Sequence, residues 1–136
     1  MTTMTYKQKC SGFSLPETLL VAAILSYAIS VILTTFISSV GLNEASRNLT
    51  TATSHAQYVM ESVKNTAFAN MATSITSGTW NWNTAAVTSN GLAALNSESI
   101  ATTYSGTNPL TVTVTVSWQD THARSRTKAL QTLMSG

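Results

Sequence analysis

The side chain with the clearest chemical role is Glu17, a single acid at the start of a long uncharged segment. The residues from Thr18 to Asn43 include no Asp, Glu, Lys or Arg. About 20 such residues in a helix are enough to cross the hydrocarbon core of a membrane. An ionised carboxylate costs about 2.5–3.5 kcal/mol at the centre of such a helix on insertion scales, so it needs a positively charged partner. The chemistry expected of Glu17 is therefore neutralisation of a cation.

No other group of side chains predicts a reaction centre. His55 and His122 have no cysteine or acid cluster at metal-ligand spacing, and the chain has no glycine-rich phosphate loop or nucleophile elbow. Asp120 stands without the neighbouring oxygen ligands that a calcium site requires. We expect no catalytic residue, no metal and no cofactor, and we do not expect an enzyme.

The flanks of the apolar segment predict its orientation. Residues 1–12 contain Lys7 and Lys9 and no acid, so the N-terminus is expected to stay in the cytoplasm and the C-terminal part to lie outside. A secretory signal has its apolar region before its cleavage site, whereas here a short polar leader ends at Ser11-Gly12 and the apolar region follows. The leader also holds Cys10, the only cysteine, so no intramolecular disulfide is expected.

This order of residues, from Lys9 to Val21, resembles the class III signal of type IV prepilins and type II secretion pseudopilins. Gly12, Phe13 and Glu17 fall where that family places them. The resemblance implies cleavage between Gly12 and Phe13 by a prepilin peptidase on the cytoplasmic side of the membrane. It also implies N-methylation of the new terminal residue, Phe13.

Cleavage after Gly12 would also supply a partner for Glu17, the α-amino group of Phe13. Four residues of helix place Glu17 about 6 Å further along the axis. By resemblance, Glu17 neutralises the N-terminal amine of a neighbouring subunit and sets the axial register of assembly. The alternative is an uncleaved single-pass anchor in which Glu17 lies at the headgroups and caps the helix, where a carboxylate is favourable in any case.

Downstream of Gly41 the pattern becomes amphipathic, and we expect one helix from about Leu15 to about Ala72. Its apolar stripe has helical spacing and is formed by Ala45, Leu49, Ala52, Ala56, Val59 and Val63, with Ala67 and Met71 beyond. Two i,i+3 ion pairs are expected on its solvated face, Glu44 with Arg47 and Glu61 with Lys64.

The C-terminal residues predict a β-hairpin at 110–134 that lies across the long helix. Its first strand alternates strictly between apolar and hydroxyl side chains, from Thr111 to Trp118. A polar turn and a second strand from Ser125 to Met134 follow. This ending is similar to the C-terminal hairpin of minor pilins of the PilV type and of the small type II secretion pseudopilin I.

The expected fold class is α+β, with a long N-terminal α-helix packed on a small C-terminal antiparallel β-sheet, as in pilins. The expected parts are a cleaved leader (1–12), a hydrophobic transmembrane or filament-core helix (13–41) and an extracytoplasmic domain (42–136). Within that domain, we expect helix to about residue 72, a loop region over 73–108 and the hairpin. In the loop region, Trp80 and Trp82 are spaced to share one face of a strand, where they either cover the helix or form an exposed contact patch.

The charge balance argues against general binding of nucleic acid. The chain carries 9% charged residues and a net charge of +2, and two of its seven basic residues, Lys7 and Lys9, lie in the leader. Without the leader, five basic residues balance five acidic ones. Arg124, Arg126 and Lys128 alternate along the final strand and are expected to face one side. This row is either a solvated, edge-protecting row or a contact surface for DNA.

The resemblance implies a structural subunit, a minor pilin or pseudopilin of a type IV pilus or a type II secretion-like filament. Its implied partners are other such subunits, the prepilin peptidase, an inner-membrane assembly platform and, before assembly, membrane lipid. The implied location is the inner membrane as a single-pass protein, then the pilus or pseudopilus. Two alternatives remain open: a DNA-binding minor pilin of a DNA-uptake pilus, and a membrane-tethered module that never polymerises.

Overall fold

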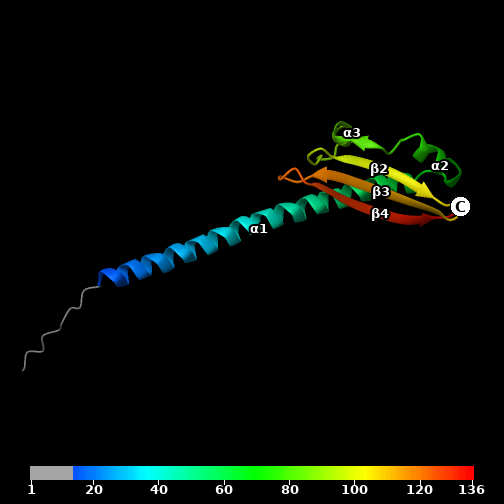
Figure 1. Cartoon of the computed structure of the whole chain (residues 1–136). Coiled ribbons are helices and arrows are strands. Elements are labelled where there is room, and N and C mark those ends of the chain that lie inside the picture. The colour runs from blue at the N-terminus through cyan, green and yellow to red at the C-terminus, as the bar shows by residue number, and fades with distance from the viewer. Residues whose placement is uncertain (1–13) are drawn as a thin grey trace, which may run out of the picture. The chain divides into compact units, whose positions relative to one another are not determined.

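The computed structural model describes residues 14–136, so the expected cleavage and methylation sites, Gly12 and Phe13, lie outside the described part. In chain order the elements are α1 (Leu15–Lys64), α2 (Phe68–Thr76), β1 (Trp82–Asn83), α3 (Thr84–Ser89), β2 (Ser99–Ser105), β3 (Leu110–Gln119) and β4 (Ser125–Met134) (Figure 1). This arrangement confirms the predicted α+β class, a long N-terminal helix with a small antiparallel sheet. The chain divides after Gly41 into an N-terminal unit and a C-terminal unit of residues 42–136.

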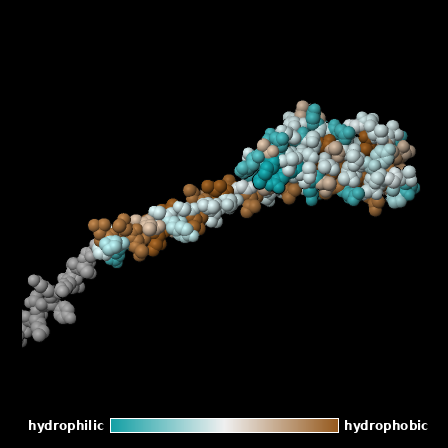
Figure 2. Space-filling view, viewed as in Figure 1, coloured by the Kyte–Doolittle hydropathy of each residue, from teal (hydrophilic) through white to brown (hydrophobic). Residues whose placement is uncertain are grey.

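The N-terminal unit contains the apolar part of α1, and every side chain that the structure describes there is exposed. Apolar side chains dominate its surface in Figure 2, and α1 is long and apolar enough to cross a membrane. The hydroxyls within it donate to carbonyl oxygens one turn back, as in Ser26 to Ala22 (2.8 Å) and Ser30 to Ser26 (2.9 Å). Because these hydroxyls are satisfied inside the helix, they do not oppose an apolar environment.

The C-terminal unit is built on a four-stranded antiparallel sheet with the order β1-β2-β3-β4. The hairpin expected at residues 110–134 is present as β3 and β4, with Val114 opposite Leu130. On the other side of β3, Val114 is opposite Thr102 of β2. The second half of α1 lies against one face of this sheet (Figure 1).

The core lies between that face and α1. β3 contributes every second residue, and its inward side chains are Leu110, Val112, Val114, Val116 and Trp118. The facing side chains of α1 are Ala52, Ala56, Val59, Met60 and Val63. The alternation therefore places apolar side chains on the core and hydroxyls on the outer face. The predicted stripe is right from Ala52 to Val63, but Ala45, Leu49 and Ala67 are exposed.

The expected helix to about Ala72 is instead two helices, because α1 ends at Lys64 and α2 begins at Phe68. Ala67 between them is extended, with φ −57° and ψ 133°. The break reverses the chain, so that Met71 and Ile75 of α2 join the core. Asn65 and Thr66, which are weak helix formers, occupy this break.

Residues 73–108 hold more structure than the expected loop. They include the end of α2, then β1, α3 and β2. The side chain of Asn83 accepts a hydrogen bond from the Ala86 N–H (2.9 Å) and so caps α3, which buries Val87. Ile100 of β2 is also buried. Short elements of this kind leave little periodic signal in a sequence.

Candidate functional site

Glu17 lies in the first turn of α1 and is exposed. The carbonyl of Ser14 accepts hydrogen bonds from the backbone N–H groups of Glu17 (3.0 Å) and Thr18 (3.1 Å). The first turn of the helix, which contains Glu17, is therefore hydrogen-bonded. Within residues 14–136, no Lys, Arg or His lies within ion-pair distance of the Glu17 carboxylate. This side chain is therefore free to bind a cation that the described residues do not supply.

Small side chains form a stripe along the apolar part of α1. They recur at every fourth position, as Ala22, Ser26, Ser30, Thr34 and Ser38. The last three hydroxyls each donate to the carbonyl four residues back, at 2.8–2.9 Å. We call these five residues the small-residue stripe. Small residues at four-residue spacing allow two helices to approach closely in a membrane.

The two tryptophans pack on the core and do not share a strand. Trp80 precedes β1, is 5% exposed and donates its indole N–H to the Ser62 hydroxyl (3.0 Å). Trp82 is half-buried, donates to the Thr79 carbonyl (3.2 Å) and lies with its ring centre 6.1 Å from that of Tyr58. Of the two alternatives for Trp80, packing on the core is the one that the structure shows.

Two members of the basic row are held by an acid in the turn between β3 and β4. The Asp120 carboxylate accepts from Arg124 Nε (2.8 Å) and Arg126 Nε (3.3 Å). Its other oxygen accepts from the backbone N–H groups of Arg124 (2.9 Å) and His122 (3.0 Å). The Arg124 backbone N–H is the largest cause that lowers the pKa of Asp120, and with the other donors it outweighs partial burial and brings this pKa to about 2.

The basic row is only partly as predicted. Arg124 precedes β4, whereas Arg126 and Lys128 lie in β4 opposite Trp118 and Val116. Directly paired residues point to the same face of a sheet, so Arg126 and Lys128 point to the face that carries α1. The two ion pairs expected on α1, Glu44 with Arg47 and Glu61 with Lys64, are not formed.

Sequence reasoning missed one polar contact in the core. His55 and Glu98 are both buried, and His55 Nδ1 lies 2.7 Å from Glu98 Oε1. The other carboxylate oxygen of Glu98 accepts from the Leu95 N–H (2.7 Å). The available signal was the position of His55 next to Ala56 and near Ala52 in the apolar stripe of the long helix. Among residues 14–136, no third potential metal ligand joins this pair.

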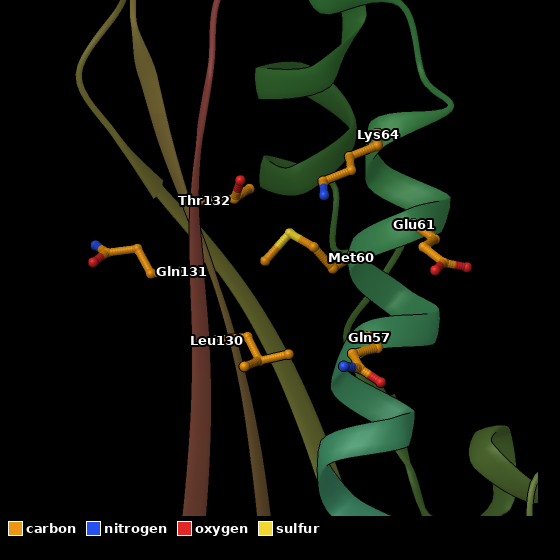
Figure 3. A pocket seen from close by; sticks show the side chains of 7 residues that line it. All are labelled: Gln57, Met60, Glu61, Lys64, Leu130, Gln131 and Thr132. Atoms are coloured by element: carbon orange, nitrogen blue, oxygen red, sulfur yellow. The ribbon is translucent and has the colours of Figure 1, made fainter.

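A groove of about 400 Å³ separates α1 from β4 (Figure 3). Its α1 wall is formed by Gln57, Met60, Glu61 and Lys64, and its other wall by residues 130–132. In Figure 3 the side chains of Met60 and Lys64 point toward β4, those of Leu130 and Thr132 point toward α1, and that of Gln131 points away. Met60 and Leu130 form the apolar floor of the groove, and polar side chains such as Gln57 and Lys64 line the rest of it.

Compared with protein families, with curated proteins and with solved structures, the chain shows no match. Three features make up the candidate site. These are an acid at the first turn of an exposed apolar helix, a small-residue stripe along that helix, and a C-terminal unit with its own core.

Proposed function

We propose that this chain is a structural subunit, a minor pilin or pseudopilin, of a type IV pilus or a type II secretion-like filament. The observation that carries the proposal is the exposed apolar part of α1 with Glu17 in its first turn, which has no ion-pair partner among residues 14–136. Such a helix requires an apolar environment, which lipid supplies before assembly and equivalent helices supply afterwards.

The first stage of the proposal is insertion in the inner membrane as a single-pass protein. Lys7 and Lys9 keep the N-terminus in the cytoplasm, and residues 42–136 lie outside. Prepilin peptidase then cleaves between Gly12 and Phe13, and Phe13 is N-methylated. The C-terminal unit can fold outside the membrane while α1 is still inserted in it, because all the buried residues that the structure describes lie between Ala52 and Trp118.

The second stage is assembly with other subunits at an inner-membrane platform. Glu17 binds the N-terminal amine of a neighbouring subunit, which offsets the energy of placing a carboxylate among apolar helices. The small-residue stripe supports this stage because it allows a neighbouring helix to pack closely. The assembled subunit belongs to a pilus or pseudopilus in the periplasm or at the cell surface.

The processed N-terminus tests the proposal directly. Mass spectrometry of the chain from its own cells is expected to find methylated Phe13 as the first residue. A Gly12→Ala variant is expected to keep its leader, because the peptidase no longer accepts the site. An intact Met1 on the wild-type chain, in cells with an active prepilin peptidase, would instead support the membrane-tethered module.

A further inference from the structure

Strand β4 forms one edge of the sheet, with no neighbour on its far side among residues 14–136. It is ten residues long, whereas β1 at the opposite edge has two residues. Along such an edge, backbone N–H and C=O groups of alternate residues have no partner within the sheet. A free edge of this length can pair with an added extended strand.

The groove between β4 and α1 would receive the inward side chains of an added strand. The inward side chains of β4 are those of Lys128, Leu130 and Thr132, which lie opposite buried valines of β3. Leu130 and the buried Met60 form the apolar floor. Lys128 precedes this floor, and Lys64 lies beside Thr132 at the other end (Figure 3).

The charges at the groove are not balanced. Neither Lys64 nor Lys128 has an ion-pair partner in the described part of the chain. Glu61 lines the same groove, but its carboxylate points away from β4 in Figure 3. Lys64 therefore lies at one end of the apolar floor, and Lys128, which precedes the lining residues on the same face of β4, lies beyond the other end. The five residues of strand from Lys128 to Thr132 cover about 13 Å.

We propose that the edge of β4 binds an extended segment of a different protein subunit, in which two acidic side chains flank an apolar one at alternate positions. The backbone of this segment pairs with β4, its apolar side chain contacts Met60 and Leu130, and its acids approach Lys128 and Lys64. The inference rests on the proposed function only in taking the partner to be another subunit of the same filament.

A second copy of this chain does not fit this description. An incoming β4 brings Arg126 and Lys128 and no acid, so it adds positive charge to the groove. The described acids of the chain are also not available in an extended segment. Glu17, Glu44 and Glu61 lie in α1, Glu98 is buried, and Asp120 is bound by two arginines.

The test uses residues 42–136, which contain all the described buried residues and so can fold without the apolar part of α1. The probe is a short synthetic peptide in which Glu, Val and Glu alternate with Thr, and the control peptide has Lys in place of Glu. Binding is followed by amide NMR. We expect the acidic peptide to shift amides of residues 128–134 in a saturable way and to leave β1 unchanged. The basic peptide is expected not to bind.

A charge variant then tests the assigned contact. Lys128→Glu is expected to weaken binding of the acidic peptide roughly fivefold, a size typical of a partly exposed ion pair. Arg47→Glu is the matched control and is expected to leave binding of the acidic peptide unchanged. Arg47 is an exposed cation about 26 Å along α1 from Lys64, without an ion-pair partner among the described residues.

Equal shifts from both peptides, no shift in β4, or equal effects of the two variants would overturn the inference. Because the fragment lacks the leader, these outcomes do not depend on processing or filament assembly.

Discussion

The imidazole Nδ1 of His55 lies 2.7 Å from the carboxylate Oε1 of Glu98, and both side chains are buried. This contact joins α1 to the segment before β2, which is 43 positions away in the chain. Glu98 also accepts the Leu95 N–H, so it fixes the backbone of that segment as well. The pair therefore ties Glu98 and, through it, the backbone of Leu95 to the second half of α1.

We expect Glu98→Ala to reduce the free energy of unfolding of residues 42–136 by about 3 kcal/mol, because removal of one partner leaves the other buried and unpaired. Urea unfolding measures this change. Glu61→Ala, at an exposed acid of the same C-terminal unit, is the control and is expected to change the free energy of unfolding by no more than about 0.5 kcal/mol. If His55→Leu combined with Glu98→Leu is no more stable than Glu98→Ala alone, the unpaired partner is not the cause.

Asp120 is expected to titrate with a midpoint at about pH 2 in the folded C-terminal unit, against 3.8 for an ordinary aspartate. Because the folded pKa is the lower one, the stabilisation is fully present above pH 3.8 and is lost as the pH falls through about 2. NMR of the Asp120 carboxyl carbon measures the midpoint. Asp120→Asn is expected to remove this part of the acid dependence.

Arg124→Gln tests the cause of that shift. It removes the guanidinium but keeps the Arg124 backbone N–H, which is the largest cause that lowers the pKa of Asp120. The midpoint is therefore expected to rise only part of the way toward 3.8. A complete return to the ordinary value would show that the side chain, and not the backbone of the turn, holds the carboxylate.

How far the fold can be predicted from the sequence differs between its parts. β3 was predictable because apolar side chains on its inner face alternate with hydroxyl side chains on its outer face. The second half of α1 was predictable where the sheet covers it, from Ala52 to Val63. The end of α1 was not, because Met71 keeps the helical spacing of the stripe although it belongs to α2. That spacing fits one long helix and a broken one equally well.

The site was predictable where neighbours in the sequence define it and not where the fold brings distant residues together. The first turn of α1 contains Glu17 as expected. The contact between His55 and Glu98 depends on a tertiary pairing that carries no local pattern. Asp120 binds Arg124 and Arg126, which are close in the sequence, but the contacts depend on the conformation of the turn between β3 and β4. They remove two cations from the row that could have faced DNA.

We expect residues 42–136 to show no measurable binding of duplex DNA even at low salt. Arg124 and Arg126 are neutralised locally by Asp120, and Lys128 is directed to the side of the sheet that carries α1. A mobility-shift titration at several salt concentrations measures this. Binding that weakens steeply with salt and is lost in Lys128→Glu would instead favour the DNA-uptake alternative.

In the proposed filament, Glu17→Ala is expected to leave processing of the leader unchanged and to reduce incorporation about tenfold or more. The physical reason is that the N-terminal amine of the neighbouring subunit loses its counter-ion in an apolar environment. Glu44→Ala, at an acid of α1 outside the groove, is the matched control. The measurement is quantitative immunoblotting of sheared filaments against the membrane pool. Normal incorporation of Glu17→Ala would contradict the role of Glu17 in register.

The small-residue stripe predicts a difference between two hydroxyl positions on the same helix. Ser30 belongs to the stripe and Thr35 does not, yet both are exposed and both donate to the carbonyl four residues back. Ser30→Leu is expected to reduce incorporation severalfold because the larger side chain separates packed helices, whereas Thr35→Leu is expected to have little effect. Both changes make the helix more apolar, so membrane insertion, measured by carbonate extraction, should be retained in both variants. If the two variants assemble equally, close packing of α1 with its neighbours does not occur along this stripe.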